Sequence, residues 1–308
     1  MKLLKSLAIS IAFFLYLTAH AQTKEIINIT WGFSIGSNQA NSLRLICEEA
    51  NKLQDKYTFL LVGKPGAGGT IAANEVHTKP NNILAGGSSS FVIRPLYEKN
   101  EVVHNLDLFT PVVVQATGAP MAVFSKKYKT FQELMLAPRP SIGISGNGSI
   151  GHLTAVEFFN LNKNINIVSF KSNIDAGVAA AGEHIDASVG FITDLQALLD
   201  NNSINVLGYT GKKEITPNAN LLLSKQKLPE STAIASDYAI FASTAMSPER
   251  FKELHSILAL ANRQPAVVNN YSKDLATGVN MNLDQAKIWY ANSRSYWKTQ
   301  VDKLNSKQ

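Results

Sequence analysis

The chain has 308 residues, 45% of them hydrophobic, so it is long enough to bury one large core or two of medium size. Its 29 basic and 23 acidic residues give a net charge of +6, but they form no dense basic stripe interleaved with aromatic residues, and nucleic-acid binding is not indicated. The only cysteine, Cys47, excludes an intramolecular disulfide and lies in a helical pattern typical of a buried position. The six histidines form no zinc motif, and we expect neither a metal nor a cofactor.

The N-terminus has the features of a secretory signal peptide. Lys2 and Lys5 precede an apolar run over residues 7–17, and the small-x-small sequence Ala19-His20-Ala21 follows. The apolar run is too short to span a bilayer. We therefore expect residues 1–21 to be removed by cleavage after Ala21, and the mature protein to be periplasmic.

Short apolar runs alternate with helical patterns along the next part of the chain. Strands are expected over residues 26–31, 57–62, 83–86, 109–115, 121–124, 141–144 and 165–170, and helices over residues 41–53, 70–76, 130–136, 151–160 and 176–181. The portion from residue 247 onward is helical, and its late aromatic residues have a spacing typical of helix packing. This alternation predicts an α/β architecture, with mostly parallel sheets and helices on both faces.

The chain is long enough for two domains, and because no flexible linker is evident, we expect crossing strands rather than a loose tether to join them. We expect strands near residues 119–124 and 237–241 to cross between them. Domain 1 would then comprise residues 22–120 and 238–308, and domain 2 residues 121–237.

A glycine-rich turn lies between a predicted strand and a predicted helix. Residues 63–70 have the sequence GKPGAGGT, which leaves backbone N–H groups free at a helix N-terminus, a favourable position for an anion. A phosphate-binding P-loop is not indicated, because Gly69 occupies the position of its lysine. A dinucleotide fingerprint also fails, because Ile71 replaces the third glycine. A tight turn that needs glycine only for its backbone geometry remains an alternative.

Three further loops follow predicted strands. They are residues 33–38 (FSIGSN), 86–90 (GGSSS) and 145–152 (SGNGSIGH). Ligands of open α/β sheets bind beyond the carboxyl ends of the strands. All of these loops are rich in glycine and hydroxyl groups and poor in charge, which suits a carboxylate held by backbone N–H and hydroxyl donors.

A secreted hydrolase is the competing interpretation. Ser149 lies three residues before His152, but a nucleophile elbow needs G-x-S-x-G, and Asn147 occupies the place of the first glycine. No pair of carboxylates lies in a comparable loop for glycosidase chemistry. We therefore predict a binding protein and not an enzyme.

Taken together, these motifs resemble those of the periplasmic solute-binding receptors of tripartite tricarboxylate transporters, also called Bug-type receptors. Residues 64–73 (KPGAGGTIAA) are similar to the family's P-G-A-G-G-x-x-G/A turn, and residues 146–153 (GNGSIGHL) to its G-x-G-S-x-x-H-L segment. Residues 108–112 (LFTPV), 168–172 (VSFKS) and 182–186 (GEHID) resemble D-F-T-P-V, V-P-Y-K-G and G-G-Q-V-D. The motifs follow the family order.

The resemblance implies a two-domain Venus-flytrap periplasmic binding protein of type II, with a ligand cleft between the domains. It implies a monomer that binds a small carboxylate, usually a di- or tricarboxylate and sometimes an amino acid or aromatic acid, and delivers it to a membrane permease. A periplasmic sensor that presents its closed form to a signalling receptor is the alternative. The resemblance and the four loops together predict these ligand contacts: Phe33, Ser34, Gly36, Asn38, Gly66, Ala67, Gly68, Thr70, Ser88, Ser89, Asn147, Ser149, Ile150, His152 and Lys171.

Several positions depart from the family pattern, and two of them bear on the ligand. Ala40 lies in the first loop region where relatives carry an acid, which leaves the effect of this loop on the ligand open. Gly190 occupies a place where many relatives carry an acid that would suit an amino group on the ligand. The absence of an acid at position 190 favours a ligand without a cationic group.

Overall fold

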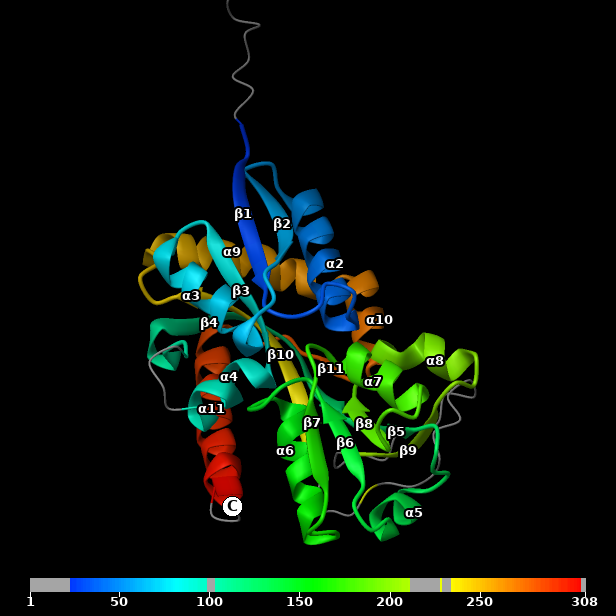
Figure 1. The fold of residues 1–308 in the computed structure, drawn as a ribbon. Helices are drawn as coiled ribbons and strands as arrows, with labels where there is room; N and C mark the ends of the chain where they lie inside the picture. The colour runs from blue at the N-terminus through cyan, green and yellow to red at the C-terminus, as the bar shows by residue number, and fades with distance from the viewer. Residues whose placement is uncertain (1–22, 99–102, 211–227, 229–233, 306–308) are drawn as a thin grey trace, which may run out of the picture.

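A computed structural model describes residues 23–98, 103–210, 228 and 234–305 (Figure 1). The predicted signal peptide, residues 1–21, and its cleavage site lie outside these ranges. Within them, no helix combines the length and the apolar character that crossing a membrane requires.

The first sheet has six strands. Their order is β11 (Thr277–Gly278), β4 (Phe109–Pro120), β10 (Ala235–Ser243), β3 (Ile83–Ser88), β1 (Glu25–Trp31) and β2 (Tyr57–Gly63). Strand β1 runs parallel to both β2 and β3. Strand β10 runs antiparallel to β3 and β4, and β11 runs antiparallel to β4.

The second sheet has five strands. Their order is β7 (Asn166–Ser169), β6 (Ser141–Ile144), β8 (Ala187–Gly190), β5 (Ala122–Ser125) and β9 (Asn205–Tyr209). Strand β6 is parallel to β7 and β8, whereas β5 is antiparallel to β8 and β9.

The α/β class is confirmed, but both sheets are mixed where mostly parallel sheets were predicted. Every antiparallel pair includes β4, β5 or β10. Strand β4 leads through Met121 directly into β5 of the other sheet, and β10 begins the return of the chain to the first sheet (Figure 1). These strands connect the two sheets instead of belonging to a βα repeat, so no crossover helix forces them to run parallel. The bounds of the two domains remain a prediction.

Helices fill the connections between strands. They are α2 (Asn38–Leu53), α3 (Thr70–Thr78), α4 (Ser89–Tyr97), α5 (Phe131–Leu136), α6 (Ile150–Glu157), α7 (Asn173–Ala181), α8 (Gln196–Asp200), α9 (Pro248–Asn262), α10 (Pro265–Lys273) and α11 (Leu283–Asn305). Short 3₁₀ turns occur at η1 (Ala67–Gly69), η2 (Leu106–Leu108), η3 (Phe158–Asn160) and η4 (Ile192–Leu195). Helix α4 was not predicted, because its first turn is made of serines and Pro95 lies near its end.

Helices cover both faces of the first sheet (Figure 1). Neighbouring residues of a strand point to opposite faces, and two glycines of β3 identify the helices on each side. A Cβ on Gly86 would meet Leu43 of α2, whereas one on Gly87 would meet Phe91 of α4. Helices α9 and α10 pack with α2, and α11 packs with α4.

The core of the first sheet lies against these helices. Cys47 of α2 is buried there as predicted, and burial raises the pKa of its thiol to about 12. Of the four late aromatic residues of α11, Tyr290 and Trp297 are buried and Trp289 is partly buried, but Tyr296 is exposed, so the predicted packing role holds for three of them.

Candidate ligand-binding site

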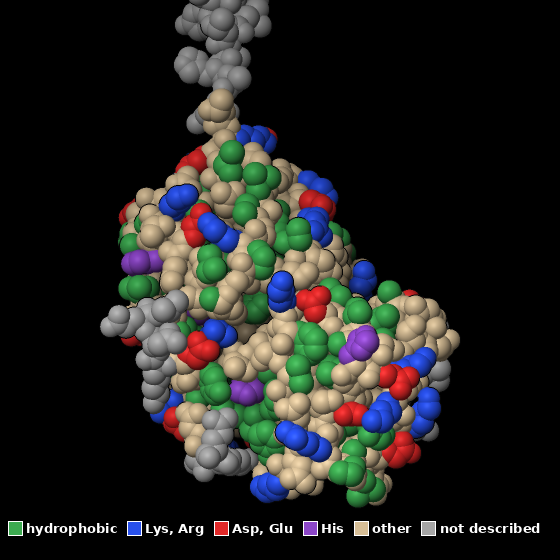
Figure 2. All heavy atoms as spheres, in the orientation of Figure 1, with side chains coloured by type: hydrophobic (Ala, Val, Ile, Leu, Met, Phe, Trp, Pro, Cys, Tyr) green, Lys and Arg blue, Asp and Glu red, His purple; other side chains and the backbone are tan. Residues whose placement is uncertain are grey.

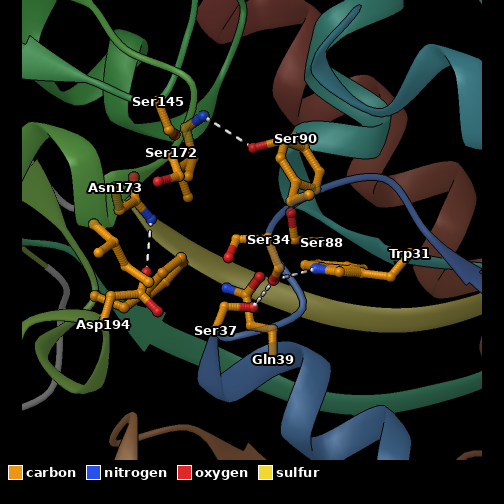
Figure 3. Close-up of a pocket in the computed structure, with 14 residues that line it drawn as sticks. Trp31, Ser34, Ser37, Gln39, Ser88, Ser90, Ser145, Ser172, Asn173 and Asp194 are labelled. Carbon is orange, nitrogen blue, oxygen red and sulfur yellow. Dashed lines mark hydrogen bonds between the residues drawn. The ribbon is translucent and has the colours of Figure 1, made fainter. Parts of the chain in front are cut away.

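A small pocket lies where the carboxyl ends of the two sheets face each other (Figure 3). We call it the central pocket; it has a volume of about 40 Å³ and is lined by Trp31, Phe33, Ser34, Ser37, Gln39, Ser88, Ser90, Ser145, Ile150, Ser172, Asn173, Ile174, Phe191 and Asp194. Each lining residue is the last of a strand or belongs to the segment that follows β1, β3, β6, β7 or β8. This is the position at which α/β sheets bind ligands.

Four helices begin at the central pocket. Ser37 and Ser172 cap α2 and α7, accepting hydrogen bonds from the N–H groups of Ala40 (3.2 Å) and Asp175 (3.1 Å). Ser88 precedes α4, and Ile150 is the first residue of α6. The positive ends of four helix dipoles therefore converge on one space, which favours an anion.

Hydrogen bonds hold the lining loops in place. The indole N–H of Trp31 and the hydroxyl of Ser37 both donate to the carbonyl of Ser34, at 3.1 and 2.9 Å. Across the pocket, the N–H of Ile150 donates to the hydroxyl oxygen of Ser90 at 3.2 Å. This bond joins α4, beside the first sheet, to α6, beside the second.

A second pocket adjoins the central one and shares Phe33 and Ser145 with it. We call it the glycine-loop pocket; it has a volume of about 380 Å³, and its other lining residues are Gly32, Pro65, Gly66, Ala67, Gly68, Arg94, Gly146, Phe170 and Lys171. The backbone of Gly66, Gly68 and Gly69 has φ of +140°, +59° and +94°. Side chains rarely adopt such angles, so the turn before α3 needs glycine.

Arg94 of α4 connects the two sides of the glycine-loop pocket. Its guanidinium donates to the carbonyl of Asn147 at 2.6 Å and pairs with Glu98 at 2.9 Å. The side chain also lies against the glycine turn, because a Cβ on Gly68 would come within 2.5 Å of Arg94 Cδ. On the face drawn in Figure 2, basic and acidic side chains are interspersed.

Two acids lie at the other side of the central pocket, Asp274 buried and Asp194 partly buried. The side-chain amide of Asn173 donates to Asp194 at 2.9 Å. Burial, with the neighbouring carboxylate of Asp274, raises the pKa of Asp194 to about 7. Asp274 accepts from the side-chain amide of Asn38 at 2.8 Å, from the Tyr238 hydroxyl at 3.2 Å, and from the Thr193 hydroxyl; burial raises its pKa as well.

The residues predicted to contact the ligand lie in several different parts of the structure. Phe33, Ser34, Ser88 and Ile150 line the central pocket, and Phe33, Gly66, Ala67, Gly68 and Lys171 line the glycine-loop pocket. Gly36 and Asn38 border a separate groove. The lining of these pockets does not include Thr70, Ser89, Asn147, Ser149 or His152. As ligand contacts, all fifteen remain predictions.

Buried hydrogen bonds give several of these residues a positioning role. His152 accepts the N–H of Gly148 at its Nδ1 (3.2 Å), and burial lowers its pKa to about 4, so it is neutral at pH 7. The Ser89 hydroxyl accepts from the N–H of Asp237 at 3.0 Å. Thr70 lies 3.4 Å from His104 Nδ1.

Sequence reasoning missed Gln39, Arg94, Ser172, Asn173 and Asp194. Residues 172–173 follow a predicted strand, so the loop argument applied to the other four loops could have found them. No local sequence pattern distinguishes Gln39, Arg94 or Asp194. These helix and loop residues line a pocket only because the fold brings the two sheets face to face.

Replacing Ser149 by alanine tests its structural role. Its hydroxyl caps α6 by accepting the N–H of His152 at 3.1 Å. We expect Ser149→Ala to lower the free energy of unfolding by about 1 kcal/mol, measured by urea denaturation. Ser247→Ala, which removes the equivalent cap of α9 far from either pocket, is the matched control. A ligand affinity that falls in Ser149→Ala but not in Ser247→Ala would indicate that Ser149 also contacts the ligand. Unchanged stability of Ser149→Ala would contradict the capping role.

The sequence matches a family model, described as the tripartite tricarboxylate transporter family receptor, over residues 44–306. The chain belongs to this family of receptors. The resemblance of its motifs is thereby confirmed over most of the chain. Among curated protein sequences, none matches the receptor.

Solved structures show the same fold. An R. palustris protein with adipate superposes on the receptor with a TM-score of 0.81 and 18% identity, covering 92% of this chain and 98% of that one. The periplasmic binding protein BugD superposes with a TM-score of 0.79 and 17% identity, covering 91% of this chain and 98% of that one. MatC from Rhodopseudomonas palustris with bound malate superposes with a TM-score of 0.76 and 17% identity, covering 90% of this chain and 99% of that one. The predicted α/β fold of a periplasmic binding protein is confirmed.

Proposed function

We propose that the receptor captures a small carboxylate between its two sheets and delivers it to the permease of a tripartite transporter. The convergence of four helix N-termini on the central pocket is the observation that carries this proposal. Membership of a receptor family and the malate and adipate bound by proteins of the same fold support it.

Binding would proceed by hinge closure. In this proposal residues 22–120 and 238–308 form one lobe, residues 121–237 form the other, and the crossing strands form the hinge. The bonds from Ile150 to Ser90 and from Arg94 to Asn147 join the lobes. A ligand carboxylate competes with Ser90 for the N–H of Ile150, and it favours the closed form by as much as it binds that form more tightly. The central pocket has a volume of only about 40 Å³, so a ligand enters it when the lobes separate.

The remaining parts of the proposal concern the setting of the receptor. We propose that it acts in the periplasm as a monomer after cleavage behind Ala21, and that it carries out no catalysis. The Nδ1 lone pair of His152 accepts the N–H of Gly148, and the Ser149 hydroxyl caps α6, so the two side chains are not arranged as a base and a nucleophile.

Thermal unfolding of the mature protein against a ligand panel tests this function. The panel contains mono-, di- and tricarboxylates, amino acids and sugars, and native mass spectrometry verifies that the protein starts free of ligand. A ligand at about 100 times its dissociation constant stabilises the folded state by about 2.7 kcal/mol. For a chain of this size we expect the midpoint to rise by roughly 5–10 °C. Shifts with sugars alone, or with no compound carrying a carboxylate, would contradict the proposal.

A further inference from the structure

Two polar atoms at the central pocket make no hydrogen bond of good geometry, although Gln39 lies beside the Tyr238 hydroxyl. They are Nε2 of Gln39, a side chain that is only 8% exposed, and Oδ1 of Asn173. Buried polar groups in folded proteins are almost always hydrogen-bonded, and leaving one unsatisfied is costly. One of these atoms is a donor and the other an acceptor, so the pocket offers complementary sites to a ligand that carries both kinds of group.

The same pocket contains one formal charge, and it is negative. Asp194 lines the pocket, and none of the described lining residues is lysine, arginine or histidine. No ion pair joins Asp194 or Asp274 to a cation within the described residues. A carboxylate that is even partly withdrawn from water, as Asp194 is, costs free energy when it has no cationic partner. A cationic group on the ligand would supply that partner.

The groups face one another across a short space. In Figure 3 the amide nitrogen of Gln39 points toward the side of the pocket where Asn173 and Asp194 lie. Gly190 makes room for this arrangement, because a Cβ there would come within 3.1 Å of Asn173 Cβ. Asp194 reaches the pocket from η4 and is held by Asn173.

We infer that the central pocket selects an α-amino acid, with Asp194 as the residue that determines this specificity. The ligand ammonium donates to Asp194 and to Oδ1 of Asn173. The adjacent ligand carboxylate accepts from Nε2 of Gln39 and from the N-terminal end of α6 at Ile150. This inference rests on the proposed function and narrows its carboxylate ligand to a zwitterion, which reverses the expectation drawn from Gly190 alone.

The pH dependence of binding distinguishes a zwitterion from a dicarboxylate. The groups facing Asp194 are Asp274, Tyr238, Asn173 and the backbone N–H of Asn38; they include no cation. The free pocket holds the pKa of Asp194 near 7. An ammonium group needs the ionised form, so binding releases a proton and the affinity rises by about tenfold from pH 6 to pH 8. A second carboxylate placed beside Asp194 needs the protonated form, and its affinity falls over the same range.

Calorimetric titration with matched ligand pairs tests the inference. Each pair shares a carbon skeleton and differs only in the amino group: L-aspartate with succinate, L-glutamate with glutarate, and L-alanine with propionate. The mature protein is compared with Asp194→Asn, which keeps the shape of the side chain and removes its charge. Asp200→Asn is the matched control, because it removes an acid from the exposed end of α8.

We expect an amino-bearing member to bind more tightly than its partner, with an affinity that rises with pH. Asp194→Asn should lower the affinity for the amino-bearing ligand by roughly 10- to 100-fold and abolish its pH dependence, because the substitution removes a charge-assisted hydrogen bond. Asp200→Asn should leave the affinity and its pH dependence unchanged. Tighter binding of succinate, glutarate or propionate would overturn the inference while leaving the proposed function intact, and so would an Asp194→Asn variant with unchanged preference. If no carboxylic acid of the wider panel binds, the proposed function falls as well.

Discussion

Replacing Gly32 by alanine is expected to disrupt the glycine turn, lowering the free energy of unfolding by about 1–3 kcal/mol and weakening ligand binding by about tenfold or more. A Cβ on Gly32 would lie 2.4 Å from Cα of Gly69, far inside van der Waals contact. The obstructing atom belongs to the backbone, so no side chain can rotate away, and the segment from Gly66 to Gly69 must shift as a whole. Urea denaturation and calorimetric titration with the ligand that the panel identifies measure the two effects.

Gly36→Ala provides the matched control for this prediction. Gly36 lies in the same loop after β1, but a Cβ there would meet only the Ser34 hydroxyl, at 3.6 Å, which is an ordinary contact. We expect this variant to change stability by less than about 0.5 kcal/mol. If the two alanine variants behaved alike, the close approach of Gly32 to the turn would not be what positions the site.

The sequence was most informative about the glycine turn between β2 and α3. The strand, the turn and the helix were all predicted, and the backbone angles of Gly66 and Gly68 show why glycine is present. This success has a local cause, since a strand, a left-handed turn and a helix N-terminus each depend on neighbouring residues. The same local argument located the loops at residues 33–38, 86–90 and 145–152.

The sequence was least informative about the far side of the pocket. Gln39 lies in the first turn of α2, and Asp194 lies in η4 among apolar residues; neither position shows a chemical role by itself. Their role depends on contacts between segments that are 81 or more residues apart in the chain, as with the bond from Thr193 to Asp274 and the bond from Asn38 to Asp274. Pairing of residues this distant leaves no periodic signal in one sequence. The crossing segments near residues 119–124 and 237–241 were predicted, but their antiparallel direction was missed, because the alternation of elements does not reveal how crossing strands pair.

Replacing Trp31 by alanine is expected to cause the largest loss of stability, about 3–5 kcal/mol. Trp31 ends β1, is only 2% exposed, and forms part of both the hydrophobic core and the wall of the central pocket. Its ring lies 5.2 Å from that of Phe33, and its indole N–H donates to Ser34. Alanine would leave a cavity at the junction of core and site, and urea denaturation measures the loss.

Trp31→Phe separates packing from hydrogen bonding at this position. Phenylalanine keeps most of the buried ring but loses the indole donor. The Ser34 carbonyl still accepts from the hydroxyl and the N–H of Ser37, at 2.9 and 3.3 Å, so it is not left unsatisfied. We therefore expect a loss of only about 1–2 kcal/mol. A loss equal to that of Trp31→Ala would mean that the bond from the indole to Ser34, and not the filling of the core, holds the first loop against the pocket.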